Sequence, residues 1–201
     1  MTAPAIDSPQ TLPVELQDRR APAWWGVVCL IATEAALFAY FLFSYFYLGS
    51  IARGAWPPHG PPELRLALPN TLVLLASSGT MWWAESAIRR GNQARLRAGL
   101  GLTIALGAVF LGVQMVEYHN SDFGPRTGAY GSLFYTITGF HGAHVAVGLL
   151  MLLVVTARAW LGHFAAGRHL AVTNTAWYWH FVDVVWLAVF TSLYLSPRLA
   201  G

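Results

Sequence analysis

The sequence predicts an all-α integral membrane protein, a bundle of five transmembrane helices with its N-terminus in the cytoplasm and its C-terminus outside. Hydrophobic residues make up 56% of the 201 positions and charged residues 10%, whereas soluble domains carry about 25% charged residues. The mean hydropathy is +0.48. Five apolar stretches reach the roughly 20 residues that an α-helix needs to cross a membrane. This composition excludes a soluble, disordered, collagen-like or nucleic-acid-binding protein.

The five predicted spans follow a polar N-terminal tail and together form one domain, residues 24–201. The tail, residues 1–23, contains four prolines and lacks the basic start and apolar middle of a signal peptide. Cys29 is the single cysteine, so an internal disulfide and a cysteine-only metal site are excluded. The predicted spans cover residues 24–48, 69–88, 97–116, 133–157 and 174–196.

The distribution of arginine predicts the orientation, because cytoplasmic loops of membrane proteins carry an excess of basic residues. Eight arginines fall in the N-terminal tail, the second loop and the fourth loop, against four in the remaining loops and the C-terminal end. Tryptophans near the span ends are typical of the membrane–water interface. The tryptophans assigned to this interfacial belt are Trp24, Trp25, Trp82, Trp83, Trp160, Trp177 and Trp179.

Glu34 is the first candidate functional residue, because an ionisable group inside a membrane needs a partner, a neutral state or a task. It lies ten residues into the first span, about 15 Å from the cytoplasmic end of the helix. Proton handling or a polar contact with another subunit would explain it. A neutral carboxylic acid hydrogen-bonded to a neighbouring helix explains it equally well. Asp183, in the fifth span, falls at a similar depth, so the two carboxyl groups could share a polar layer.

Three histidines lie in the last two spans. His141 and His144 are three residues apart, and so are His180 and Asp183, which places each pair on one face of a helix. The histidines could ligate zinc or iron, or His144 and His180 could hold a haem between two spans. Hydrogen bonds to neighbouring helices explain the same residues. Glu117 ends the third span near the outer interface, where an ordinary solvated carboxylate is expected.

Two long motifs give the chain a specific resemblance. Residues 130–148 read YGSLFYTITGFHGAHVAVG, and residues 178–194 read YWHFVDVVWLAVFTSLY. Glu34 in TEAALF, and the segment QMVEY at residues 114–118, stand in the matching order. The sequence resembles subunit III of the haem–copper oxidases, most closely that of cytochrome c oxidase, from about residue 24 to residue 194. The longest members of that family have seven spans, and this chain begins at what would be their third.

The resemblance implies an accessory subunit of a proton-pumping terminal oxidase in a bacterial inner membrane. Such a subunit holds no haem, copper or other metal and has no catalytic residue of its own; both cofactors belong to the catalytic subunit I. Subunit I, subunit II, smaller subunits and bound phospholipid are the implied partners. Glu34 would be the family's intramembrane carboxylate, related to proton uptake. The residues with an implied structural or lipid-contact role are His141, His144, His180, Asp183 and Glu117.

Three alternatives remain open from the sequence. The parent complex could be a quinol oxidase or a nitric oxide reductase instead of a cytochrome c oxidase. The chain could be a free-standing b-type cytochrome that uses His144 and His180 as haem ligands. A small transporter with Glu34 as its proton site is the third alternative, although the five spans show no inverted repeat.

Overall fold

The computed structural model of the chain describes residues 22–58 and 60–199, and all its extended regular structure is helical. The first four predicted spans each lie inside one helix, and the fifth, residues 174–196, runs through three consecutive helical elements, so the five segments are confirmed as helical. Most of the predicted tail, residues 1–21, lies outside the described residues. The helices are α1 (Pro22–Ile51), α2 (Leu64–Arg89), α3 (Gln93–Asn120), α4 (Ala129–Trp160) and α5 (Leu170–Phe190), and α5 continues through the π-helical η2 (Thr191–Leu195) into α6 (Ser196–Leu199).

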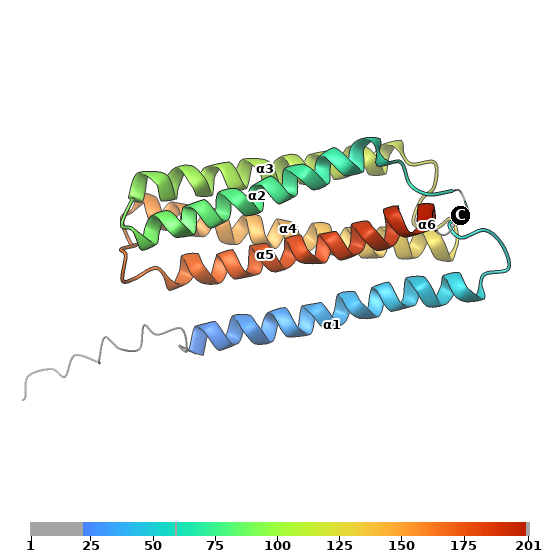
Figure 1. Ribbon diagram of the computed structural model, residues 1–201, viewed down its shortest axis with the longest axis horizontal. Helices are drawn as coiled ribbons and strands as arrows, with labels where there is room; N and C mark the ends of the chain where they lie inside the picture. Colours follow the sequence, from blue (N-terminus) through green and yellow to red (C-terminus); the bar gives the residue numbers. More distant parts are fainter. Residues whose placement is uncertain (1–21, 59, 200–201) are drawn as a thin grey trace, which may run out of the picture.

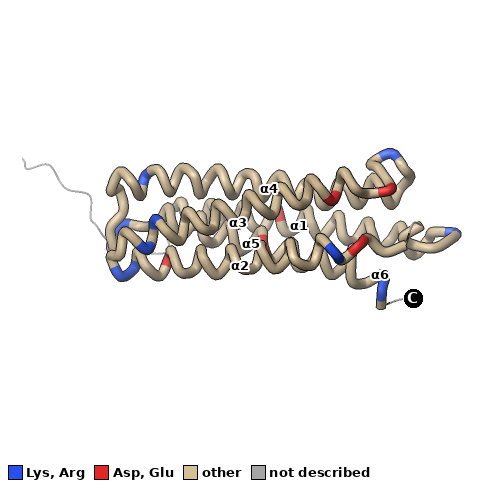
Figure 2. The backbone as a smooth tube through the Cα atoms, turned by 90° about the horizontal axis from the view of Figure 1, so that it is seen from above, with Lys and Arg blue, Asp and Glu red and all other residues tan. Residues whose placement is uncertain are grey.

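Four of the long helices form a bundle, and the fifth lies along its side (Figure 1). Helix α2 packs along α3, α3 along α4, α4 along α5, and α5 back against α2. Among the described helices, α1 makes close contacts only with α4 and α5, and most of its side chains are exposed. Charged residues gather near the two ends of the bundle, with few in the middle (Figure 2). This distribution is the one that a bilayer requires.

Four helical segments in the described part of the chain are long and apolar enough to cross a membrane: α1, α3, α4 and residues 170–199. Helix α2 does not reach the same hydropathy. Its buried positions include the polar side chains of Asn70, Thr71, Ser77 and Glu85. These polar side chains lower the average hydropathy of α2. They are buried within the bundle, so they do not prevent α2 from packing against its neighbours.

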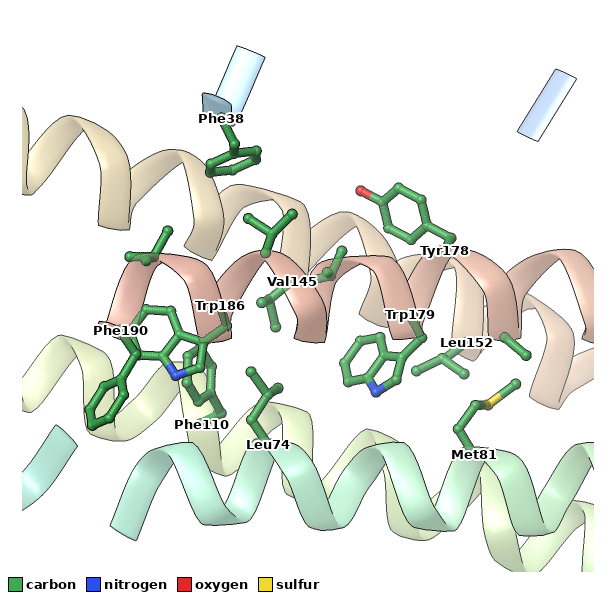
Figure 3. Close-up of a cluster of buried hydrophobic side chains, with 14 of the residues drawn as sticks. Phe38, Leu74, Met81, Phe110, Val145, Leu152, Tyr178, Trp179, Trp186 and Phe190 are labelled. Carbon is green, nitrogen blue, oxygen red and sulfur yellow. The ribbon is translucent and has the colours of Figure 1, made fainter. Parts of the chain in front are cut away.

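Two tryptophans of α5 form the centre of the core (Figure 3). Trp179 is fully buried, and a Cβ atom on Gly148 would lie 2.8 Å from its ring. The indole Nε1–H of Trp179 donates to the hydroxyl of Ser77 at 3.0 Å, and that of Trp186 donates to Thr71 at 2.9 Å. The interfacial position predicted for Trp179 is therefore wrong, because two glycines, Gly107 and Gly148, leave room for its ring inside the bundle. Of the other tryptophans assigned to the belt, Trp24 is half-buried and the rest are exposed.

The α2–α3 turn and the α4–α5 loop are joined at one end of the bundle. The side-chain amide of Gln93 donates to the backbone oxygen of Phe164 at 2.7 Å. Arg97 donates to the backbone oxygen of Ala159 at 3.2 Å, and its guanidinium lies 4.9 Å from the ring centre of Trp160. These contacts fix the two connections relative to each other.

Candidate functional site: polar groups inside the bundle

Glu34 is held by a histidine of another helix. Its carboxylate Oε2 lies 2.9 Å from Nε2 of His144 on α4, and Nδ1 of the same ring lies 2.7 Å from the backbone oxygen of Phe140. Phe38, one turn along α1, packs edge-on to the His144 ring at 5.2 Å. Because α1 otherwise contacts the bundle sparsely, this polar pair is a principal link between α1 and α4. Glu34 faces His144, and Asp183 belongs to a separate network.

Asp183 and His180 meet at one hydroxyl. Ser78 of α2 donates to Oδ2 of Asp183 and lies 2.7 Å from Nδ1 of His180. A hydroxyl has a single proton, so Ser78 accepts a hydrogen bond from His180 when it donates to Asp183. The carboxyl group is almost entirely buried. The one-turn spacing of His180 and Asp183 on α5 thus lets both side chains contact the same residue of α2, Ser78.

Ser78→Ala is expected to lower the free energy of unfolding by about 0.6–1.7 kcal/mol, between the average and the largest value found for hydrogen bonds between membrane helices. The substitution removes the partner of both His180 and Asp183. Unfolding in mixed micelles with increasing dodecyl sulfate measures the change. Ser44→Ala is the matched control, because the Ser44 hydroxyl donates only to the backbone oxygen of Tyr40, one turn earlier in its own helix. Equal effects of the two substitutions would contradict the prediction.

Glu117 is more deeply placed than the sequence suggests. Oε1 accepts a hydrogen bond from the Tyr194 hydroxyl at 2.7 Å, and Oε2 accepts one from the Gln114 amide at 3.3 Å. Tyr194 belongs to the π-helical segment η2. The expectation of an ordinary solvated carboxylate is therefore wrong: Glu117 joins α3 to η2 at the end of the bundle and lines a pocket of about 280 Å³ with Asp122.

His141 lies in an aromatic enclosure at the centre of the bundle. Its ring is 4.8 Å from that of Trp186, 5.7 Å from Phe110 and 6.4 Å from Phe38. Neither ring nitrogen has a hydrogen-bond partner among residues 22–58 and 60–199. Within those same residues, no group of three or more His, Cys, Asp or Glu side chains is arranged to hold a metal ion.

Glu85 and Ser78 are site residues that the sequence reasoning missed. Glu85 pairs with Arg89 at 2.6 Å, one turn along α2. It also lines a mainly apolar groove of about 400 Å³ together with His180, and Ile31 of α1 forms part of the same wall. The four-residue spacing of Glu85 and Arg89 is a recognisable sequence signal. Ser78 gives no such signal, because serine is common in membrane spans.

The sequence of this chain is similar to known proteins over most of its length. Residues 20–197 match the family described as Cytochrome c oxidase subunit III. Cytochrome c oxidase subunit 3 of Synechocystis sp. is 42% identical over 174 residues, which cover 85% of this chain and 74% of the relative. The platypus Ornithorhynchus anatinus protein of that name is 39% identical, covering 85% and 68%. That of the coelacanth Latimeria chalumnae is 40% identical, covering 92% and 71%. This multi-pass membrane protein belongs to the cytochrome c oxidase subunit III family.

Proposed function

We propose that the chain is an accessory, non-redox subunit of a proton-pumping cytochrome c oxidase in a bacterial inner membrane. The observation that carries the proposal is the family match over residues 20–197, which includes the whole helical bundle apart from its last residues. The complex would reduce oxygen to water with electrons from cytochrome c, in its catalytic subunit I. This chain would stabilise that subunit, hold lipid and support proton uptake.

The proposed topology has five spans, with α2 as the additional one. Helix α2 has 26 residues, or about 39 Å at the rise of an α-helix, and its outward side chains include Leu68, Leu72 and Leu75. Six described arginines lie at one end of the bundle and four at the other. By the positive-inside rule, the richer end, with the α2–α3 turn and the α4–α5 loop, is cytoplasmic. The N-terminus then lies inside and the C-terminus outside, and residues 24–201 form one domain.

The Glu34–His144 pair is the proposed link to proton uptake. A carboxyl group and an imidazole within 2.9 Å can exchange a proton without a large rearrangement. The pair is also part of the attachment of α1, so its loss would affect both the position of the helix and the supply of protons to the partner subunit.

A pocket in the α4–α5 loop supports the proposed retention of phospholipid. Arg158, His163 and Arg168 line a volume of about 370 Å³ together with Phe164. Guanidinium groups bind phosphate through paired, charge-assisted hydrogen bonds. At the cytoplasmic end of the bundle, this lining suits the phosphate of a lipid headgroup.

The non-redox assignment rests on what the histidines already bind. Both ring nitrogens of His144 have partners, Glu34 and the backbone oxygen of Phe140. His180 uses Nδ1 toward Ser78. A bis-histidine haem would require His144 to give up one of these hydrogen bonds, which argues against the b-type cytochrome alternative.

Affinity purification of the tagged chain in a mild detergent tests the proposed function. Reduced-minus-oxidised spectra are recorded before and after the partners are stripped from the chain. Haem and copper are expected to arrive with the complex and to leave with a large partner. His144→Leu is expected to leave the haem content per complex unchanged. A haem that stays on the stripped 22.0 kDa chain, or the loss of one haem in the variant, would overturn the assignment.

A further inference from the structure

A small pocket opens at the turn between α2 and α3, and none of the residues in the polar networks described above lines it. Its volume is about 110 Å³, which suits a single phosphate group and not a whole lipid. The side chains around it combine two cations, two hydrogen-bonding groups and one interfacial aromatic ring. The lining residues are Trp83, Ser86, Ala87, Arg90, Asn92 and Arg95.

The two arginines of this pocket are available for a ligand. Arg90 and Arg95 are exposed, and no carboxylate among the described residues pairs with either. Their neighbours are already engaged, since Arg89 pairs with Glu85 and Arg97 donates to the α4 backbone. The pocket therefore concentrates two positive charges that no described carboxylate compensates.

The backbone of the turn holds the two arginines in place. Gly91 adopts φ +71°, a left-handed conformation that glycine adopts without steric cost. The Asn92 side chain accepts a hydrogen bond from the Arg95 backbone N–H at 3.0 Å and so begins α3 at a defined residue. Gln93 ties the turn to Phe164 in the neighbouring loop. The fixed turn thus places Arg90 and Arg95, which are five positions apart in the sequence, at the same pocket.

We propose that this pocket binds the phosphate of an anionic phospholipid headgroup, of the phosphatidylglycerol class. Arg90 and Arg95 would donate to the phosphate oxygens, and Trp83 would lie at the headgroup level beside the acyl chains. A lipid is favoured over free phosphate because an aromatic side chain, Trp83, lines the pocket, and both it and the adjacent Trp82 are exposed. The assignment rests on the orientation proposed above, which puts the turn at the cytoplasmic leaflet, where anionic lipids are enriched. The site is distinct from the pocket of Arg158 and Arg168.

The test is lipid titration of the full-length chain in a mild detergent, followed by native mass spectrometry. Dioleoylphosphatidylglycerol is the probe, and the wild-type chain is compared with R90Q/R95Q. The variant is expected to lose one bound lipid and to show at least about a tenfold weaker affinity at that site, as charge-assisted hydrogen bonds to phosphate are lost. R158Q/R168Q is expected to leave this site occupied.

R65Q/R126Q is the matched control, because it removes the same charge from exposed positions at the opposite end of the bundle. It should bind the lipid as the wild type does.

Circular dichroism verifies that each variant is folded. The variant R90K/R95K keeps the charge without the guanidinium fork and should show intermediate affinity. Unchanged binding by R90Q/R95Q overturns the proposal. Equal binding of dioleoylphosphatidylcholine, or displacement by equimolar inorganic phosphate, overturns the anionic headgroup. None of these results alters the co-purification of haem with the chain, so the proposed function is judged separately.

Discussion

Trp179→Ala is expected to lower the free energy of unfolding by about 3–5 kcal/mol, the cost of removing a fully buried aromatic side chain. The ring is enclosed by Gly107 and Gly148, which offer no side chain that could relax into the cavity. The Ser77 hydroxyl also loses its donor, the indole Nε1–H. Unfolding in mixed micelles with increasing dodecyl sulfate, followed by circular dichroism, measures the change.

Trp177→Ala provides the matched control for this prediction. It removes the same side chain two residues earlier on α5, where the ring is 50% exposed. We expect a change of about 0.5 kcal/mol or less, as is usual for surface positions. If both substitutions lower the free energy of unfolding equally, the stability of the core does not depend on the Trp179 ring or on its contact with Gly148.

Glu34→Ala is expected to lower the free energy of unfolding by about 1–3 kcal/mol, the cost of leaving a buried hydrogen-bonding group without its partner. The substitution leaves Nε2 of His144 without its partner and removes a principal polar contact of α1.

In the complex, the variant oxidase is expected to assemble and then to lose activity sooner during turnover than the wild type does. Activity over successive turnovers, with haem content as the measure of assembly, reports this loss.

A double-mutant cycle with His144→Ala separates the Glu34–His144 contact from other effects. If the two residues act through their hydrogen bond, the double variant is expected to be no less stable than Glu34→Ala alone. Glu34→Gln serves as the conservative variant, since an amide can still bond to the imidazole. Strictly additive effects would show that Glu34 stabilises α1 by some other contact. Absence of haem from the membrane of the variant would assign Glu34 to assembly.

The positions of the helices were predictable from local composition. Apolar stretches of membrane-spanning length depend only on neighbouring residues, so all five predicted spans lie within helices. Helix α2 shows the limit of this reasoning. Its polar residues, such as Asn70 and Ser77, are covered by other helices of the bundle. A hydropathy average cannot register this, because it gives a polar residue the same value whether the side chain faces the bundle or the membrane.

The partners of the polar residues were not predictable. Glu34 and His144 are 110 positions apart, and Ser78 and Asp183 are 105 apart. The sequence placed Glu34 and Asp183 at similar depths and allowed them one polar layer. Depth along a helix does not specify which way a side chain faces, and the structure divides the two carboxyl groups between separate networks.

The sequence by itself determined the class of the protein, its family, the helical segments and the residues that must be polar inside the bundle. Only the tertiary structure decided that Trp179 is core and not interface, that Glu117 is held by Tyr194, and that Ser78 joins His180 to Asp183. The physical reason is that whether a helix is long and apolar enough to cross a membrane depends only on the residues within it. The direction of each face follows from how α1 to α5 pack, and that packing depends on small residues of neighbouring helices that carry no signal when read alone.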